Sequence, residues 1–242
     1  MIWALHGAVG MAADWRAFAA GLPSEFGGLR RLDLWRFLDC CPMSLEACGN
    51  ALNEEILRVD PKPVLLGYSM GGRLALHALL AKPSAWKAAI IVSAHTGLSS
   101  ESERAQRRKK DAEWSSLALK GEWPDFLEQW NAQSVLGDAG DLPDRSELKS
   151  RRASVARSFV DWSLGTQAEL LPELAKITCP VLWVTGERDE GFTQLGRDAV
   201  ARLPNAEHRI ISDCGHRIPW EKPEQFSRVC LDFLAMHLKH TI

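Results

Sequence analysis

The feature that most constrains the fold of this chain is a serine flanked by glycines, placed between an apolar run and a helical segment. The run Pro63-Val64-Leu65-Leu66 precedes Gly67-Tyr68-Ser69-Met70-Gly71, and residues 72–80 have the pattern of a helix. In a G-x-S-x-G sequence between strand and helix, a sharp turn holds the serine at the end of the strand. We therefore interpret Ser69 as a nucleophile with an exposed hydroxyl. A plain glycine-rich turn is the alternative.

Two later residues supply the base and the orienting acid that such a serine needs, in the chain order serine, acid, histidine. The apolar segment 181–185 is followed by Asp189, and the segment 208–211 is followed by His216. Both residues thus follow predicted strands, at the sheet edge where open α/β folds build their sites. The alternatives are a turn or helix N-cap for Asp189 and a carbonyl-capping loop histidine for His216.

An early loop predicts the second half of an oxyanion hole. One N–H comes from the residue after the nucleophile, here Met70, and the other from a loop after an early strand. The apolar segment 2–5 is followed by His6-Gly7-Ala8. We expect the N–H of Ala8 to be the second donor, with Val9 as the neighbouring option. His6 is expected to brace this loop, because the triad needs only one base.

The bulk composition excludes several classes of function. With 242 residues, 46% of them hydrophobic, the chain can form one large domain with an insertion. A net charge of −2 implies no general attraction to nucleic acid, and no apolar stretch approaches the roughly 18 residues of a membrane span. Six cysteines without a C-x-x-C pair, and no basic leader, predict a cytoplasmic protein with reduced thiols. No metal or other cofactor is expected, and the sequence leaves open a monomer or a homodimer.

The order of elements predicts an α/β fold with a helical insertion. Strands alternating with helices predict a mostly parallel central sheet with helices on both faces. The predicted strands are 2–5, 29–34, 63–66, 88–92, 181–185 and 208–211, and the predicted core helices are 11–20, 45–58, 72–80 and 223–238. Between the strands, residues 98–165 predict only helices, at 101–119, 124–130 and 146–164. We interpret 1–97 and 166–242 as the core and 98–165 as an all-helical cap over Ser69.

One arginine is placed to face the predicted nucleophile. Arg73 lies four residues after Ser69, so both share one side of the helix beneath the cap. An unpaired cation is costly there, so we expect a carboxylate of the protein or of a ligand beside it. Most cationic residues of the insertion are instead expected to form a solvated helix face.

With Ser69, Asp189 and His216 in place, the chain resembles the α/β-hydrolase superfamily and, within it, the MenH family of menaquinone biosynthesis. The resemblance is carried by residues 67–75, 95–98, 103–111, 186–189 with Phe192, and 215–216 before 221–223. The chain departs from that family at 33–38, where many relatives have an Asp-Leu-Pro-Gly-His-Gly loop. It departs again at Gly191, where a lysine is expected.

The resemblance implies a lyase reaction. In that family the serine takes a proton from the substrate, and pyruvate is eliminated from the enolpyruvyl cyclohexene carboxylate SEPHCHC to give the cyclohexadiene SHCHC. The expected partner is therefore a small anionic carboxylate. The residues that the resemblance assigns to the substrate are Tyr68, Arg73, Arg107, Trp130 and Arg152, and Asp111 is expected to hold Arg107 across one helical turn.

Two other functions remain open from the sequence. A carboxylesterase or C–C bond hydrolase would use the same residues through an acyl-enzyme on Ser69. A ligand-binding protein without catalysis is the third possibility, and the intact set of Ser69, Asp189 and His216 argues against it.

Overall fold

A parallel sheet forms the centre of the molecule. The computed structural model describes residues 1–137 and 143–238. These residues form one six-stranded sheet in the order β2-β1-β3-β4-β5-β6, in which all neighbouring strands pair parallel. The strands are β1 (Ile2–Leu5), β2 (Leu29–Leu32), β3 (Val64–Tyr68), β4 (Ala88–Val92), β5 (Val181–Gly186) and β6 (Ala206–Ile211). The strand order reverses between β1 and β3, which is where α/β sheets open a crevice for ligands.

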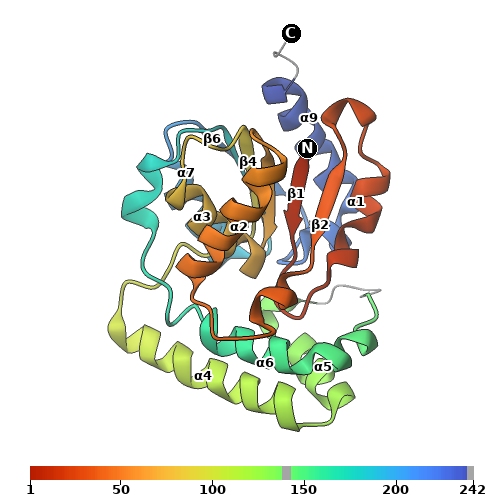
Figure 1. The fold of residues 1–242 in the computed structure, drawn as a ribbon, viewed down its shortest axis with the longest axis vertical. Coiled ribbons are helices and arrows are strands. Elements are labelled where there is room, and N and C mark those ends of the chain that lie inside the picture. Colours follow the sequence, from red (N-terminus) through yellow and green to blue (C-terminus); the bar gives the residue numbers. More distant parts are fainter. Residues whose placement is uncertain (138–142, 239–242) are drawn as a thin grey trace.

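Helices cover both faces of the sheet, as Figure 1 shows. Successive residues of a strand point to opposite faces. Trp3 and Trp183 therefore join the core beneath α2 (Leu45–Val59), α3 (Met70–Ala81) and α7 (Glu190–Val200). Ile2 and Val184 join the core on the other face, beneath α1 (Arg16–Ala20) and α9 (Pro223–Leu238). Burial on both faces explains the continuous apolar run of β4 and confirms the predicted layered α/β architecture.

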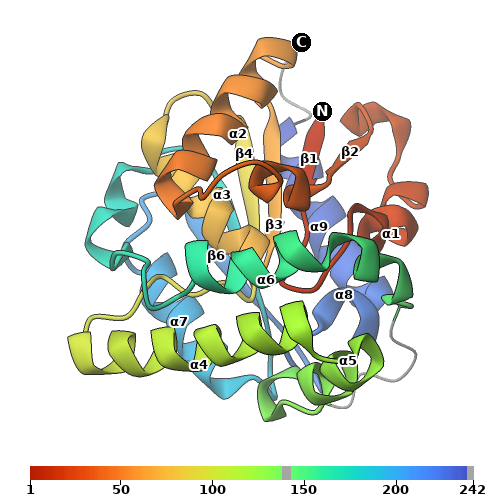
Figure 2. The ribbon, with the colours of Figure 1, turned by 60° about the horizontal axis from the view of Figure 1, so that its bottom comes forward.

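Three helices lie beyond the carboxyl ends of the strands, at the bottom of the view in Figure 1. They are α4 (Glu101–Lys120), α5 (Trp123–Asn131) and α6 (Arg152–Asp161), and the described residues between β4 and β5 form no strand. Figure 2 shows α4 and α6 side by side across this end. Aromatic rings pack between these helices with centroid separations of 5.2–6.5 Å, from Trp114, Phe126, Trp130 and Phe159. We keep the division into a core and a cap at residues 98–165 as an interpretation.

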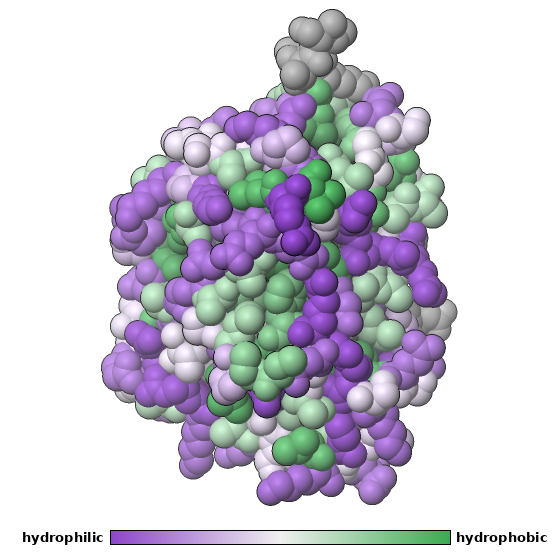
Figure 3. Space-filling model, viewed as in Figure 1, coloured by the Kyte–Doolittle hydropathy of each residue, from purple (hydrophilic) through white to green (hydrophobic). Residues whose placement is uncertain are grey.

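The outer side of α4 is polar, and its ends follow simple capping chemistry. Ser100 accepts a hydrogen bond from the N–H of Glu103 and so satisfies one of the free backbone donors at the start of α4. Arg104 and Arg108 both pair with Glu101 and also donate to the Gly165 carbonyl, so these two arginines are half-buried rather than fully solvated as expected. In the space-filling view of Figure 3, hydrophilic side chains prevail along this lower end of the molecule. No helix in the described ranges combines the length and apolar character that crossing a membrane requires.

Three predicted elements differ most in the structure. The helix predicted over 11–20 is divided into a 3-10 helix (Ala12–Trp15) and α1 (Arg16–Ala20). The single helix predicted over 146–164 is divided into a 3-10 helix (Ser146–Arg151) and α6, because Arg151 leaves the helical backbone region with φ −108° and ψ 13°. The strand predicted over 29–34 ends at Leu32, because the Asp33 carboxylate accepts from the N–H of Trp35 and starts a 3-10 helix (Leu34–Leu38). The remaining short helices are α8 (Ile218–Glu221) and the 3-10 helices Ser24–Phe26, Ser134–Leu136 and Leu171–Lys176.

Candidate active site

Ser69 lies at the turn between β3 and α3 in a strained backbone conformation. Its φ of 52° and ψ of −113° are rare for a residue with a side chain. Glycines allow the surrounding backbones to approach: a Cβ on Gly67 would lie 2.6 Å from the carbonyl oxygen of Gly71. A Cβ on Gly71 would lie 2.5 Å from that of His6. The close packing holds the turn, and the turn presents the half-buried Ser69 side chain to the cleft beneath the cap.

The structure brings Ser69, His216 and Asp189 into one hydrogen-bonded row. The Ser69 hydroxyl lies 3.1 Å from Nε2 of His216, and Nδ1 of His216 lies 2.7 Å from Oδ2 of Asp189. Asp189 occupies the N-cap position of α7, but its carboxylate makes no capping hydrogen bond and contacts His216 instead. With Nδ1 donating to the carboxylate, Nε2 is free to take a proton from the serine.

Backbone contacts between two loops hold the acid and the histidine in register. A Cβ on Gly186, at the end of β5, would collide with the carbonyl oxygens of Cys214 and Gly215. The Glu221 carboxylate accepts from the N–H groups of Gly215 (2.7 Å) and Arg217 (3.0 Å), on either side of His216. This support by Glu221 was not among the roles predicted from the sequence. Its position five residues after the histidine, in the first turn of a short helix, is the signal that points to one.

The loop after β1 faces Ser69 as the oxyanion-hole prediction requires. Ala8 lines the cleft beside Ser69, and Met70 is the first residue of α3, where backbone N–H groups lack helical partners. His6 is fully buried; its Nε2 accepts from the N–H of Leu34 (3.1 Å) and its Nδ1 lies 2.9 Å from the Gly7 carbonyl. Burial lowers the pKa of His6, so the ring stays neutral and braces the loop, as expected.

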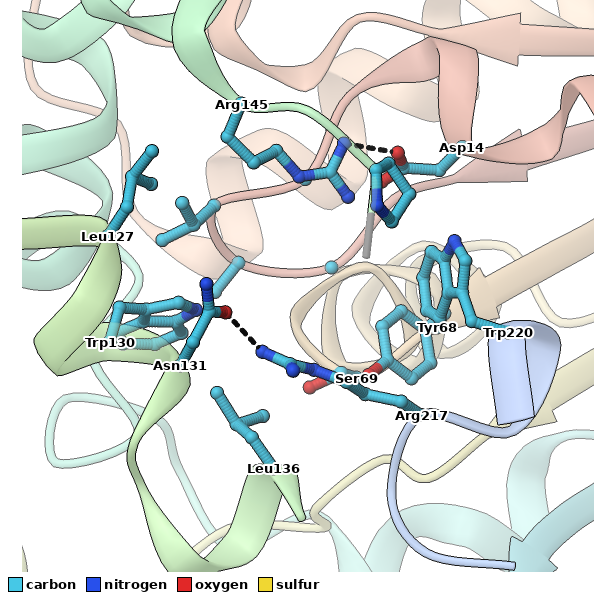
Figure 4. Close-up of a pocket in the computed structure, with 15 residues that line it drawn as sticks. Asp14, Tyr68, Ser69, Leu127, Trp130, Asn131, Leu136, Arg145, Arg217 and Trp220 are labelled. Carbon is cyan, nitrogen blue, oxygen red and sulfur yellow. Dashed lines mark hydrogen bonds and ion pairs between the residues drawn. The ribbon is translucent and has the colours of Figure 1, made fainter. Parts of the chain in front are cut away.

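A cleft beneath the cap extends from Ser69 as two lobes. We call the larger, of about 260 Å³, the Arg73 lobe and the smaller, of about 60 Å³, the Arg217 lobe. Figure 4 shows the smaller one. The residues common to both lobes are Ala8, Ser69, Trp130 and Leu136. The charged residues are Arg73, Arg107, Lys110 and Asp111 in the Arg73 lobe, and Asp14, Arg145 and Arg217 in the Arg217 lobe.

Arg73 presents a buried guanidinium to the larger lobe. It is 9% exposed and donates to Oε1 of Gln167 (3.1 Å) and to the Trp162 carbonyl (2.7 Å). No carboxylate of the described residues lies within 4.0 Å of it, so neutral acceptors alone hold the group. Burial and the nearby Arg107 charge lower the pKa of Arg73 to about 9, while Asp111 opposes the shift. The side chain remains a cation at neutral pH and is complementary to a ligand carboxylate.

Arg107 is held as predicted. Its Nε lies 2.9 Å from each oxygen of Asp111, and Asp111 also accepts from the Ser163 hydroxyl (2.7 Å). The sequence analysis did not assign Lys110 to the site, because neighbouring cations on one helix indicate a solvated face. His95 also lines the lobe, but burial and the charges of Arg73 and Arg107 lower its pKa to about 4. The positive charge of the lobe therefore comes from Arg73, Arg107 and Lys110.

Arg152 is the expected substrate arginine that the structure places elsewhere. Its guanidinium donates to the carbonyls of Ala118 (2.9 Å) and Gly121 (2.6 Å) and lies 5.9 Å from the Trp123 ring. It lines neither lobe. The last carbonyls of a helix lack partners and attract cations, so Arg152 closes the C-terminal end of α4 instead of reaching the cleft.

The other expected contacts, Tyr68 and Trp130, line the cleft. Tyr68 is 6% exposed, packs against Gly7 and Trp220, and faces the Arg217 lobe. Trp130 lines both lobes and packs against Trp114. The described residues contain no group of three side chains suited to hold a metal ion.

Sequence reasoning did not find the polar residues of the Arg217 lobe. Figure 4 shows two pairs across it: Arg145 with Asp14 at 2.5 Å, and Arg217 with Oδ1 of Asn131 at 2.5 Å. The position of Arg217 directly after the triad histidine was the available signal. Arg145 and Asp14 are 131 residues apart, and no local pattern connects them.

Comparisons with known proteins identify a family and several relatives of this chain. The family model described as the alpha/beta hydrolase family matches residues 4–229. The 2-succinyl-6-hydroxy-2,4-cyclohexadiene-1-carboxylate synthase of Serratia proteamaculans is 28% identical over 244 residues, which cover 97% of this chain and 92% of that protein. The same-named protein of Yersinia pestis is 27% identical over 245 residues, covering 97% and 87%.

Solved structures show the same fold. MenH from S. aureus superimposes with a TM-score of 0.84 at 22% identity, covering 98% of this chain and 93% of that one. A thermophilic esterase from Thermogutta terrifontis gives a TM-score of 0.78 at 22% identity, covering 98% and 90%. Since the family model spans nearly the whole chain, the protein belongs to the alpha/beta hydrolase family.

Proposed function

We propose that the protein is a MenH-like lyase that eliminates pyruvate from SEPHCHC to give SHCHC. Relatives bearing the name of that synthase align along almost its full length, which supports the proposal. The catalytic residues are Ser69, His216 and Asp189, with the N–H groups of Ala8 and Met70 as the oxyanion hole. Arg73 and Arg107 bind carboxylates, and Tyr68 and Trp130 contact the substrate. A cytoplasmic location and a monomeric or homodimeric state remain predictions from the sequence.

The observation that carries the proposal is the buried Arg73 guanidinium, which has only neutral acceptors and opens onto the same lobe as Ser69 and His216. A desolvated cation without a counter-charge is unfavourable, and a substrate carboxylate would supply that charge. With Arg107 and Lys110 beside it, the lobe favours a substrate bearing more than one negative charge. A simple neutral ester would leave the Arg73 guanidinium without a counter-charge, whereas Arg107 already pairs with Asp111.

The proposed chemistry is a proton abstraction followed by elimination. Ser69, deprotonated by His216, removes a proton from the substrate carbon beside the carbonyl of the succinyl group. The electron pair of the broken C–H bond passes through an enolate, whose oxygen the N–H groups of Ala8 and Met70 stabilise. It then forms a new ring double bond, the existing ring double bond shifts by one position, and the C–O bond to the enolpyruvyl group breaks. Pyruvate leaves as its enolate, whose CH2 carbon takes the proton held by His216, and this transfer returns His216 to its neutral state.

A carboxylesterase or C–C bond hydrolase is the second candidate, and the hydrogen-bonded row of Ser69, His216 and Asp189 favours it equally. There Ser69 would attack a carbonyl carbon and form an acyl-enzyme that water then cleaves. The two candidates differ in how they use the Arg73 lobe. The lyase needs its cations for the substrate, whereas hydrolysis of a small neutral ester needs only the triad and the oxyanion hole.

A paired assay on wild type and Arg73→Ala separates the candidates. Removing one partner of a desolvated charge pair costs about 2–5 kcal/mol. We expect Arg73→Ala to lower kcat/KM for pyruvate elimination from SEPHCHC by tens- to thousands-fold. Hydrolysis of p-nitrophenyl acetate should change little. Arg58→Ala, an exposed arginine on α2, is the matched control and should change neither rate. Efficient ester hydrolysis by wild type with no detectable elimination would establish the hydrolase instead.

A further inference from the structure

Arg217 places a second buried guanidinium beside Ser69, in the lobe that Arg73 does not line. The residue is 7% exposed and follows the triad histidine directly, so its position is tied to the catalytic loop. One nitrogen donates to Oδ1 of Asn131 on α5. No carboxylate within the described parts of the chain lies at ion-pairing distance from the guanidinium. Figure 4 shows the group extending across the lobe near Ser69.

The acidic groups near Arg217 are engaged elsewhere. Asp14 pairs with Arg145 at 2.5 Å and also accepts from the N–H of Met11. Glu221 accepts from the N–H groups of Gly215 and Arg217 and from the Arg188 side chain. The Arg217 lobe therefore contains one cation whose charge the protein does not balance. Burial lowers the pKa of Arg217, which is the electrostatic sign of this unbalanced position.

We infer that the Arg217 lobe is a second carboxylate subsite, which binds a small anionic arm of the substrate while the rest occupies the Arg73 lobe. The inference rests on the proposed lyase function and names the part of the substrate that this lobe receives. At about 60 Å³, the lobe suits a group of a few heavy atoms and is much smaller than its neighbour. The three-carbon carboxylate that departs as pyruvate fits this description, and the ring with its longer arm does not.

The lining of the lobe provides more than charge. Tyr68 lines it, and burial raises the pKa of its hydroxyl far above the usual range, so this group remains a hydrogen-bond donor. Trp220 packs edge-on against Tyr68 and adds an apolar wall. A carboxylate here would meet a guanidinium and a neutral hydroxyl within a largely apolar pocket, which is the usual composition of a small-molecule subsite. Its position beside Ser69 places the departing arm next to the reacting atoms.

A structural role for Arg217 makes a different prediction. The hydrogen bond to Asn131 connects the histidine loop to α5, so Arg217 could serve only to hold the two together. Two variants separate these roles. Arg217→Gln removes the positive charge and keeps an N–H donor for Asn131. Asn131→Ala removes the connection and keeps the charge. A subsite depends on the charge, whereas a connecting role depends on the hydrogen bond.

The test is a titration of each variant with pyruvate, in which calorimetry or ligand-observed NMR measures binding. Neither measurement needs turnover. Wild type should bind pyruvate at least tenfold more tightly than the neutral analogue pyruvamide. Arg217→Gln should weaken pyruvate binding by tenfold or more, Asn131→Ala by much less, and the exposed control Arg197→Gln not at all. Arg217→Lys, which keeps the cation, should retain part of the affinity and serves where the glutamine variant does not fold.

Several outcomes would overturn the subsite. The first is that wild type does not bind pyruvate, and the second is that wild type and Arg217→Gln bind it equally well. The third such outcome is that Asn131→Ala loses as much affinity for pyruvate as Arg217→Gln does. The result is distinguishable from the fate of the lyase proposal. Charge-dependent pyruvate binding without SEPHCHC turnover would retain the subsite and reject the lyase. Elimination with an unchanged KM in Arg217→Gln would retain the lyase and reject the subsite.

Discussion

At the scale of single residues, the site depends on a backbone strain that tertiary contacts maintain. Ser69 holds φ at 52°, and the glycines around it permit the contacts that keep it there. A residue in such a conformation costs on the order of 1–3 kcal/mol and persists only where its surroundings over-determine it. The strain sets the direction of the hydroxyl, which lies 3.1 Å from Nε2 of His216.

Because the proposed triad acts as a unit, its members should not contribute additively. Ser69→Ala and His216→Ala should each lower turnover by several orders of magnitude, and the double variant should be little worse than either single one. Circular dichroism should show folded protein in each case. The measurement is kcat/KM for whichever reaction wild type performs. Near-normal turnover in Ser69→Ala would remove the serine from the mechanism.

Local sequence patterns correctly predicted the roles of residues whose contacts lie within a few positions along the chain. The turn at Ser69 and the pairing of Arg107 with Asp111 follow from local spacing, whereas the bracing role of His6 was expected because the triad needs only one base. Arg152 and Arg217 could not be placed in this way. The direction of a long side chain depends on which carbonyls or cavities the fold brings near it from distant parts of the chain. Arg152 binds the carbonyls at the end of α4.

At the scale of elements, α8 and the loop before it form a support for the histidine. Glu221 lies at the end of α8 and accepts from two backbone N–H groups that flank His216. The four central strands β1, β3, β4 and β5 were predictable because burial on both faces gives continuous apolar runs, whereas the edge strands β2 and β6 are mostly not buried. The break between the 3-10 helix and α6 was not, because hydrophobic spacing continues across Arg151 while its backbone leaves the helical region.

Glu221→Ala should loosen the histidine loop without touching the substrate. Small displacements of catalytic groups lower rates by up to about 100-fold, so we expect kcat to fall by about 10- to 100-fold with KM nearly unchanged. Glu221→Gln, which keeps one carbonyl acceptor, should recover part of the rate. Steady-state kinetics of both variants provide the test. A rise in KM at constant kcat would instead indicate that Glu221 affects binding.

At the scale of the whole molecule, buried neutral histidines couple stability to pH. Burial lowers the pKa of His77 to about 4, with Glu46 opposing and Arg73 reinforcing the shift, and His95 is lowered to a similar value. Between pH 4 and about 6.5 the unfolded chain therefore binds more protons than the folded one. This contribution to stability is present above pH 6.5 and is lost as the pH falls towards 4.

We expect the free energy of unfolding to decrease steadily from pH 7 to pH 5. Urea denaturation at several pH values in this range measures it, provided that the m-value stays constant. His77→Gln should reduce the pH dependence, because the glutamine does not titrate. Equal stability of wild type at pH 7 and pH 5 would contradict the assignment of these histidines as buried neutral groups.

The contact between Gly186 and the carbonyls of Cys214 and Gly215 has a consequence for how such a protein diverges over evolutionary time. Even one added carbon atom at Gly186 collides with the opposing backbone. Larger side chains are therefore disfavoured where the loop after β5 meets the loop before His216. Among the described residues, α5 meets the histidine loop through a side-chain contact, the Arg217–Asn131 hydrogen bond, which a substitution can replace more easily than a contact between backbones. Substitutions in the cap can therefore change which substrate is bound, while the distance between the loops that carry the acid and the histidine stays nearly constant.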